Sequence, residues 1–141
     1  MLRVDNINSF YGKSHILQNV SLQVNENELV TLLGRNGAGK TTTLKCIVGL
    51  VPPRSGSVHS NAQPIHTPPT YDIAAMGVCL VPEERGIFKL LTVEENLKLG
   101  LQAASPWGLD DVYRIFPRLK ERRRNNGGQL SGGEQQMLAI A

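Results

Sequence analysis

Residues 34–41 read GRNGAGKT, which fits the pattern G-x-x-x-x-G-K-[ST] at every fixed position. The apolar residues 29–33 come directly before this run and have the length of a buried strand. After it, apolar side chains recur at helical spacing at Leu44, Ile47, Val48 and Val51. A strand, a glycine loop and a helix in this order predict a loop that binds the phosphates of a nucleoside triphosphate.

The residue types of this loop suit a ligand with several negative charges. Such a ligand needs many backbone N–H donors that converge on one point, and glycines let the backbone curl tightly enough to supply them. The start of the following helix adds the positive end of its dipole. We therefore expect ATP to contact the loop and the first helical turn, at Gly34, Arg35, Asn36, Gly37, Ala38, Gly39, Lys40, Thr41 and Thr42.

Three of these side chains have specific roles in this hypothesis. Lys40 places its positive charge between the β- and γ-phosphates, and the Thr41 hydroxyl is a ligand of the Mg²⁺ that bridges them. Thr42 is an additional phosphate contact. The alternative is an ordinary glycine-rich turn that leads into a helix.

The composition bounds the rest only loosely. The chain has 141 residues, 40% apolar and 19% charged, as in an ordinary soluble globular protein. Its net charge of +3 gives no general reason to expect nucleic acid or an anionic membrane as a partner. No apolar stretch approaches the roughly 18 residues that span a bilayer, and the N-terminus lacks the apolar core of a signal peptide, so we expect a cytosolic protein. Cys46 and Cys79 stand apart, which favours reduced packing thiols over a disulfide or metal site.

Hydrophobic periodicity predicts the other elements. Alternation predicts strands at residues 2–7 and 16–24, with a polar turn at 25–28 before the strand at 29–33. Another strand is predicted at 74–81, and residues 59–72 lack clear periodicity and are predicted to be loop. Helices are predicted from Lys40 to the Pro52–Pro53 pair, after a capping box at Thr92–Glu95, and over residues 109–124.

A second motif lies near the end of the chain. Residues 130–136 read LSGGEQQ, and together with the upstream glycine loop they resemble the signature sequence of ATP-binding-cassette (ABC) ATPases. Residues 131–134 also fit a capping box, which gives a purely structural alternative. A helix start with free N–H groups, flanking glycines and a serine hydroxyl is nonetheless an anion site in itself.

This resemblance implies roles for residues that the motifs alone leave open. In ABC ATPases the signature of one subunit closes on the γ-phosphate held by the glycine loop of the other, so that a head-to-tail dimer encloses two nucleotides. The signature residues expected to contact ATP in trans are Leu130, Ser131, Gly132, Gly133 and Glu134. The resemblance also implies that Tyr11 stacks on adenine. A lone tyrosine in a turn can equally be a packing residue.

Glu83 departs from the family pattern. It stands where most ABC proteins carry the glutamine of the Q-loop. An ionised glutamate only accepts hydrogen bonds, whereas glutamine also donates them. A contact with Mg²⁺ or its water therefore remains open to Glu83, while hydrogen bonds to the γ-phosphate become unfavourable. The alternative is a solvated loop charge.

Three further stretches, at residues 81–88, 91–97 and 115–123, resemble the ATP-binding subunits of importers for branched-chain or hydrophobic amino acids. ATPases of urea or short-chain amide importers share most of these motifs. The resemblance implies a second ABC ATPase subunit and transmembrane permease subunits as partners, with a substrate-binding protein acting indirectly. It places the protein peripherally on the cytoplasmic face of the inner membrane, with a permease helix in a groove near residues 83–91.

The implied fold class is α/β, the P-loop NTPase core of an ABC ATPase in an incomplete domain. Residues 1–33 would form an antiparallel β subdomain and the strand before the loop, 34–82 the P-loop core, and 83–141 the Q-loop and part of the helical subdomain with the signature. The family's Walker B Asp, catalytic Glu and switch His lie beyond the signature, so we expect a truncated fragment of a longer ATP hydrolase, without catalytic residues of its own. Such a fragment would leave apolar faces uncovered and is not expected to fold alone.

Two other function classes stay open. One is a soluble ABC protein of translation or DNA repair, which would carry a second cassette in the same chain. The other is a nucleotide-binding fragment that does not hydrolyse ATP. The basic residues 118–124 do not indicate nucleic acid: because Glu121 lies among them, and Phe116 and Leu119 recur at helical spacing, they are interpreted as a solvated helix face.

Overall fold

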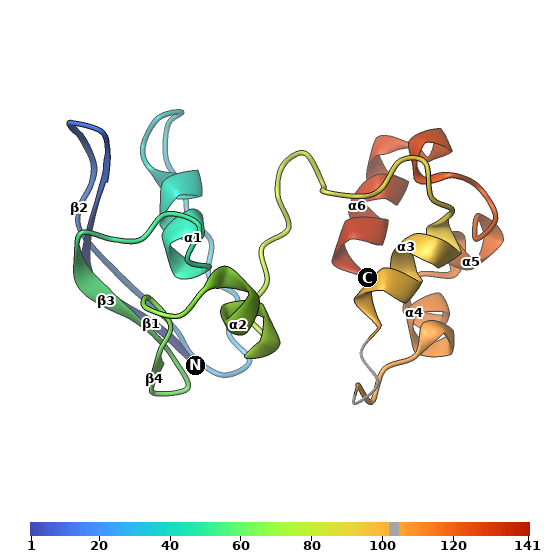
Figure 1. Ribbon diagram of the computed structural model, residues 1–141, viewed down its shortest axis with the longest axis horizontal. Coiled ribbons are helices and arrows are strands. Elements are labelled where there is room, and N and C mark those ends of the chain that lie inside the picture. Colours follow the sequence, from blue (N-terminus) through green and yellow to red (C-terminus); the bar gives the residue numbers. More distant parts are fainter. Residues whose placement is uncertain (102–104) are drawn as a thin grey trace. The chain divides into compact units, whose positions relative to one another are not determined.

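The computed structural model describes residues 1–101 and 105–141 (Figure 1). The chain divides into two units, Met1–Leu80 and Val81–Ala141. Each unit has its own cluster of buried apolar side chains. None of the described helices is long and apolar enough to cross a membrane.

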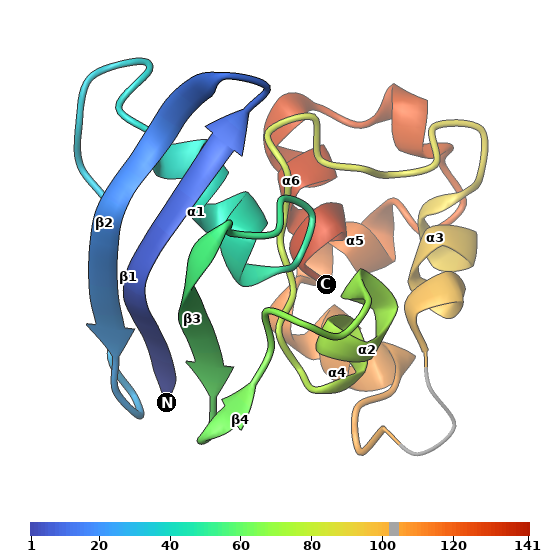
Figure 2. The same cartoon turned by 60° about the vertical axis from the view of Figure 1, so that its left-hand side comes forward.

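The unit Met1–Leu80 is built on an antiparallel sheet with the strand order β2-β1-β3-β4 (Figure 2). A long hairpin pairs β1 with β2, and the two are joined through Gly12 and Lys13. The strand bounds are β1 (Leu2–Tyr11), β2 (Ser14–Val24), β3 (Ser55–Ser60) and β4 (Gln63–Pro64). The strands predicted at residues 2–7 and 16–24 are therefore confirmed.

One face of this sheet forms the core of the unit. Helix α1 (Lys40–Ile47) packs against β1 and β2, and helix α2 (Thr70–Ala75) adds Ile73. The buried apolar residues are Val4, Ile7, Leu17, Cys46, Ile47, Val58, Ile65 and Ile73. Burial raises the pKa of the Cys46 thiol, so it stays protonated and packs as a small apolar side chain.

Helix α1 ends earlier than the sequence predicts. The prolines at 52 and 53 were expected to stop it, but the last helical residue is Ile47. The backbone N–H of Gly49 donates to the Cys46 carbonyl, and that of Leu50 donates to the Lys45 carbonyl, which satisfies the free carbonyls of the last turn. The chain thus leaves the helix at Gly49, before either proline.

Three other predictions in this unit are wrong. Residues 29–33 form no strand, because no neighbouring strand pairs with them, and the Leu29 and Leu33 side chains are 93% and 88% exposed. Residues 74–81, predicted as a strand, contain the end of α2 and an irregular segment. Residues 59–72, predicted as loop, contain the end of β3, all of β4 and the start of α2.

The unit Val81–Ala141 is helical. Its elements are α3 (Val93–Gly100), α4 (Leu109–Ile115), α5 (Pro117–Glu121), the 3₁₀ turn η1 (Gly127–Gln129) and α6 (Gly132–Ile140). Their apolar faces enclose a second core of Val93, Leu97, Tyr113, Leu119, Leu130 and Leu138. The capping boxes predicted at Thr92–Glu95 and at Ser131–Glu134 are both present.

The single helix predicted over residues 109–124 is two helices. Phe116 has φ −119° and ψ 70°, outside the helical region, and it separates α4 from α5. Pro117 follows as the first helical residue of α5, a position where its missing N–H costs no hydrogen bond. The break redirects the chain, so Leu119 is fully buried while Arg118 and the C-cap residue Arg122 stay at the surface.

Candidate functional site

The glycine loop of residues 34–39 leads into α1 and packs against β2. Gly39 has φ +89°, and a Cβ atom placed on it would lie 2.7 Å from Leu17 Cδ2. A larger residue here would have to move the loop off the sheet and would also be strained. The Ala38 N–H donates to the Arg35 carbonyl at 3.1 Å, which closes the loop into a tight turn. Gly37, with φ +83°, has open space around its Cα.

The N-terminus of α1 has no side-chain cap. The first helical hydrogen bond runs from the Thr43 N–H to the Gly39 carbonyl at 2.8 Å, and the Thr43 hydroxyl donates to the same oxygen at 3.0 Å. The N–H groups of Lys40, Thr41 and Thr42 precede that bond and have no helical acceptor. Uncapped N–H groups at the positive end of a helix favour an anion, and the glycine loop leads directly into this helix start.

The Lys40 side chain folds back over the loop. Its ammonium donates to the carbonyls of Gly34 and Arg35 at 2.8 and 2.9 Å. An ammonium has three hydrogen-bond donors. One donor therefore remains for a phosphate oxygen, while the other two hold the charge over the loop.

The other side chains of this unit that are predicted to bind ATP or Mg²⁺ differ in exposure. Thr41 is exposed and Thr42 is buried. Tyr11 is the last residue of β1, with its ring 49% exposed beside Gly12. For Mg²⁺, this part of the chain offers the Thr41 hydroxyl, and the described residues contain no group of three His, Cys, Asp or Glu side chains that could hold a metal. The loop thus fits phosphates better than it fits the ion.

The start of α6, where the sequence predicts a second anion site, is built differently from the start of α1. The Ser131 hydroxyl accepts the Glu134 N–H at 3.3 Å, and Glu134 Oε2 accepts the Ser131 N–H at 2.8 Å. This capping box satisfies two backbone donors and leaves those of Gly132 and Gly133 without helical partners. Around Gly133 the space is open, and the hydrogen of the Ser131 hydroxyl is free to donate.

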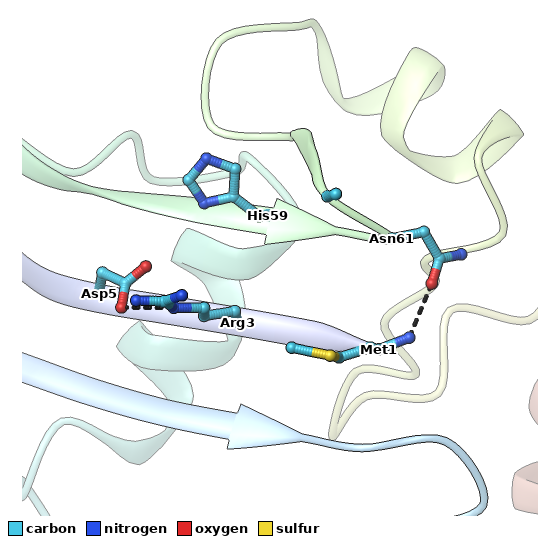
Figure 3. A pocket seen from close by; sticks show the side chains of 6 residues that line it. Met1, Arg3, Asp5, His59 and Asn61 are labelled. Carbon is cyan, nitrogen blue, oxygen red and sulfur yellow. Dashed lines mark hydrogen bonds and ion pairs between the residues drawn. The ribbon is translucent and has the colours of Figure 1, made fainter.

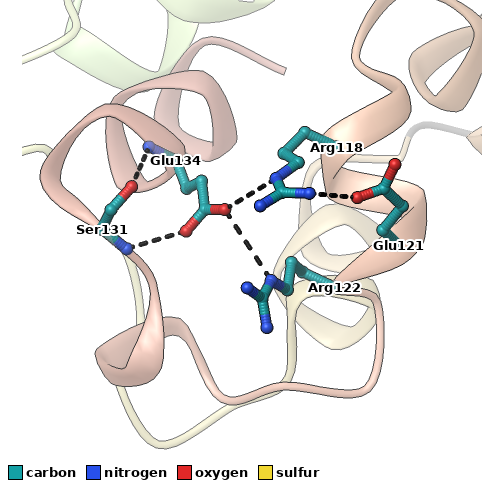
Figure 4. A network of polar contacts seen from close by, with 5 residues as sticks. All are labelled: Arg118, Glu121, Arg122, Ser131 and Glu134. Carbon is teal, nitrogen blue, oxygen red and sulfur yellow. Dashed lines mark hydrogen bonds and ion pairs between the residues drawn. The ribbon is translucent and has the colours of Figure 1, made fainter.

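Glu134 also contacts helix α5 (Figure 4). Its other carboxylate oxygen, Oε1, accepts a hydrogen bond from Arg118 Nε at 3.2 Å and lies 3.8 Å from Arg122 Nε. Only 11% of the Glu134 side chain is exposed. The backbone hydrogen bond from Ser131 lowers the pKa of Glu134, and the charge of Arg122 and the hydrogen bond from Arg118 lower it further. The carboxylate is therefore ionised at neutral pH.

These two helix starts fit a known family. A model of the ABC transporter family matches residues 17–141. The chain belongs to the ABC transporter family. The matched range includes residues 34–41 and 130–134, which stay predicted to be the P-loop and the signature of this family.

Curated relatives in the ABC family cover the whole chain. The high-affinity branched-chain amino acid transport ATP-binding protein BraG of Pseudomonas aeruginosa is 42% identical over 99% of this chain and 62% of its own length. The probable branched-chain amino acid transport protein LivF of Archaeoglobus fulgidus is 37% identical over 100% and 61%. The lipopolysaccharide export protein LptB of Haemophilus influenzae is 36% identical over 100% and 61%. The chain thus spans about 60% of the length of these relatives.

Solved ABC structures have the same fold over the chain. The ATP-binding subunit of an ABC transporter superposes with a TM-score of 0.77 at 30% identity, over 99% of this chain and 60% of that one. A dimeric ATP-binding cassette in a post-hydrolysis state, bound to ADP and Pi, superposes with a TM-score of 0.80 at 28% identity, over 99% and 67%. The α/β fold class inferred from the sequence is confirmed.

The structure groups the predicted ABC site residues by unit. The P-loop residues and Tyr11 belong to Met1–Leu80, and the signature and Glu83 belong to Val81–Ala141. Glu83 is an exposed residue of the irregular segment that opens this second unit. The structure shows no partner for it that would favour a role over the alternative of a solvated charge.

Sequence reasoning missed the side chains that support the signature. Arg118 and Arg122 are 53% and 45% exposed, as expected of a solvated face, but both also contact Glu134. Arg85, with φ +69°, donates to Gln135 Oε1 at 3.1 Å, and Gln135 donates to the Gly127 carbonyl at 3.1 Å. The four-residue spacing of Arg118 and Arg122 was a signal that both lie on one helix face.

A hollow of the first unit lies away from both motifs. It lies on the outer face of the sheet and is lined by Met1, Arg3, Asp5, His59, Asn61 and Ala62 (Figure 3). Its charged groups are paired within it: the N-terminal ammonium donates to Asn61 Oδ1 at 2.7 Å, and Arg3 Nε donates to Asp5 Oδ1 at 2.9 Å. It contains no residue of either motif.

Proposed function

We propose that the protein containing this chain is the ATP-binding subunit of an ABC importer that uses ATP binding and hydrolysis to take up branched-chain or hydrophobic amino acids. The observation that carries the proposal is the pair of anion-binding helix starts, one in the P-loop and one in the signature. The 42% identity to a branched-chain amino acid transport protein supports the choice of solute.

In the proposed complex, the P-loop holds the phosphates. The N–H groups at the start of α1 point at the ligand, and Lys40 uses its remaining donor on a phosphate oxygen. Tyr11 presents an exposed ring at the end of β1 for stacking on adenine. ATP would bring Mg²⁺, with the Thr41 hydroxyl as one ligand and Glu83 as a second contact to the ion or its water.

The signature would contact the ATP bound by a second ABC ATPase subunit. The free N–H groups of Gly132 and Gly133 and the Ser131 hydroxyl match an oxyanion, since all three are donors. A homodimer and a heterodimer with a paralogue both satisfy this arrangement. The dimeric state of the cassette with ADP and Pi supports the proposal.

A groove in the second unit suits a helix of the transmembrane permease. It is lined by Arg85, Gly86, Ile87, Phe88, Asn96, Leu97, Leu99, Gly100, Leu138, Ala139 and Ala141. The Phe88 and Leu99 side chains on its rim are 59% and 61% exposed, so apolar surface is available for docking. Docking there would hold the protein peripherally at the cytoplasmic face of the membrane. A substrate-binding protein would act through the permease, and no nucleic acid is required.

Other solutes compete with amino acids. Urea and short-chain amides fit the motif resemblance, and LptB, a lipopolysaccharide export protein, is 36% identical. A nucleotide-binding protein that does not hydrolyse ATP, and a soluble ABC protein, would have no solute.

The test compares Lys40→Ala with Lys45→Ala, a lysine on the same helix outside the P-loop motif, in the complete protein assembled with its permease. ATP turnover and uptake of radiolabelled leucine and urea are measured. We expect Lys40→Ala to abolish turnover and leucine uptake, because the phosphate charge loses its counter-ion, while Lys45→Ala retains both. Unchanged ATP turnover in Lys40→Ala would contradict the ATPase assignment. If the unsubstituted protein hydrolyses ATP and takes up urea but not leucine, the amide importer is favoured. If it hydrolyses ATP and takes up neither solute, an export protein or a soluble ABC protein is favoured.

A further inference from the structure

The signature contains an electrostatic conflict. Its helix start offers N–H donors and a hydroxyl to an anion, yet the third helical residue is the ionised Glu134. A carboxylate close to a bound phosphate repels it, and the repulsion is strong where solvent is excluded. Since only 11% of the Glu134 side chain is exposed, water does little to screen this charge.

Helix α5 supplies the compensating charge. Arg118 Nε donates to Glu134 Oε1 at 3.2 Å, and Arg122 Nε lies 3.8 Å from the same oxygen (Figure 4). Glu134 Oε2 is left to hold the Ser131 N–H at 2.8 Å. The two oxygens thus have separate partners: Oε1 contacts the arginines, and Oε2 holds the backbone of Ser131.

Arg118 is itself held in place. Its Nη1 donates to Glu121 Oε2 one turn along α5, so the guanidinium bridges two carboxylates. Such a bridge restricts the long side chain and lowers the entropy lost when it binds Glu134. An ordinary surface pair in the same unit, Arg114 with Asp111, has side chains 70% and 38% exposed and touches no motif residue.

We propose that, within the proposed ATPase, Arg118 is a positioning residue: it neutralises Glu134 and holds the signature capping box closed, so that Ser131 and the glycine N–H groups meet the γ-phosphate of the ATP bound by the partner subunit. Arg122 adds charge from the next turn. Arg118 does not touch the nucleotide, and it acts through Glu134.

The consequence is specific to the ATP-bound dimer. Removing Arg118 leaves the P-loop unchanged, so the affinity of one subunit for ATP should not change. The same substitution leaves the negative charge of Glu134 less neutralised, so the signature should close less tightly on ATP. Charge-assisted hydrogen bonds with one exposed partner are of modest strength, and we expect a loss of roughly threefold to tenfold in kcat.

The experiment uses the complete protein with Arg118→Ala, Arg118→Lys, the matched control Arg114→Ala, and Glu134→Gln with and without Arg118→Ala. ATP affinity is measured by calorimetry at subunit concentrations too low for dimers. Dimerisation with adenylyl imidodiphosphate is measured by sedimentation, and turnover and Tm are recorded. We expect Arg118→Ala to weaken dimerisation and kcat with unchanged affinity and Tm, and Arg118→Lys to recover part of both.

The double variant separates positioning from a general structural effect. In the Glu134→Gln background there is no charge to neutralise, and only a neutral hydrogen bond to Arg118 remains, so Arg118→Ala should have a much smaller effect there. An equal loss in both backgrounds, or a loss no larger than that of Arg114→Ala, would overturn the positioning role. If Arg118→Ala does not fold, Arg118→Lys in the two backgrounds gives the same comparison. Failure of the proposed function would give a different result. The unsubstituted protein would then not hydrolyse ATP, and Lys40→Ala would change nothing.

Discussion

Tyr11 is the residue whose proposed role is easiest to separate from packing. A packing tyrosine would be buried, whereas this ring is 49% exposed. Stacking on a base is worth about 1–3 kcal/mol in single-strand nucleic-acid binders, so we expect Tyr11→Ala to weaken ATP binding by roughly 5- to 150-fold. Tyr11→Phe retains the ring and should bind normally. Calorimetric titration with ATP measures this, with the exposed Tyr71→Ala as control; equal affinity in Tyr11→Ala would assign Tyr11 to packing.

At the scale of single residues, the sequence allowed residues within a motif to be named, but it did not indicate the side chains outside the motif that contact them. Lys40 and Ser131 could be named because their motifs fix the spacing along the chain. Arg118 could not, because its contact with Glu134 joins residues 16 positions apart and depends on where α5 ends. A run of arginines in a sequence does not show which of them faces another helix.

Three helices of the second unit, α3, α4 and α6, each have a capping carboxylate at the N-terminus. Glu95, Asp111 and Glu134 each accept a backbone N–H at a helix start, and this hydrogen bond lowers the pKa of each carboxyl group. Their contribution to stability is thus fully present above the unfolded-state pKa, about 4, and is lost as pH falls through the lower folded values.

We therefore predict that the Tm of the complete protein falls as pH drops below about 4, and that Glu95→Gln reduces this dependence. The glutamine oxygen still accepts the Thr92 N–H, which Glu95 accepts at 2.8 Å, but it does not titrate in this range. Thermal scans between neutral and acidic pH measure the effect, with Glu84→Gln, an exposed glutamate outside the helices, as control. The same pH dependence in both variants would remove Glu95 from this explanation.

The sheet has a similarly local requirement at Gly56. This residue of β3 has φ +90°, and a Cβ placed on it would lie 2.5 Å from the carbonyl oxygens of Asp5 and Asn6, where β1 is irregular. Because both obstacles are backbone atoms, we expect Gly56→Ala to cost about 3 kcal/mol. The Tm of the complete protein should fall by roughly 6–12 °C. Gly100→Ala, at an open position, is the control. If Gly56→Ala has the same Tm as this control, the backbone of β1 moves away at little cost.

At the scale of elements, prediction succeeded where the signal is local. The alternation of β1 and β2 and the capping boxes of α3 and α6 are readable within a few residues. Residues 29–33 and 74–81 show the limit of this reading. An apolar run indicates that a segment is suited to burial, but a strand also needs a neighbour for its backbone hydrogen bonds, and the described sheet provides none for them.

At the scale of the whole molecule, the described residues form two small cores and include apolar side chains that neither core covers. Leu29, Leu33 and Leu90 are each at least 88% exposed, and burial of such a side chain contributes about 1.5–3 kcal/mol. We predict that the polypeptide of residues 1–141, prepared alone, does not unfold in one cooperative step in urea. Far-ultraviolet circular dichroism and Trp107 fluorescence should give different midpoints, and a hydrophobic dye should bind before urea is added. One sharp transition with coincident midpoints and no dye binding would show that the two cores suffice for an independent fold.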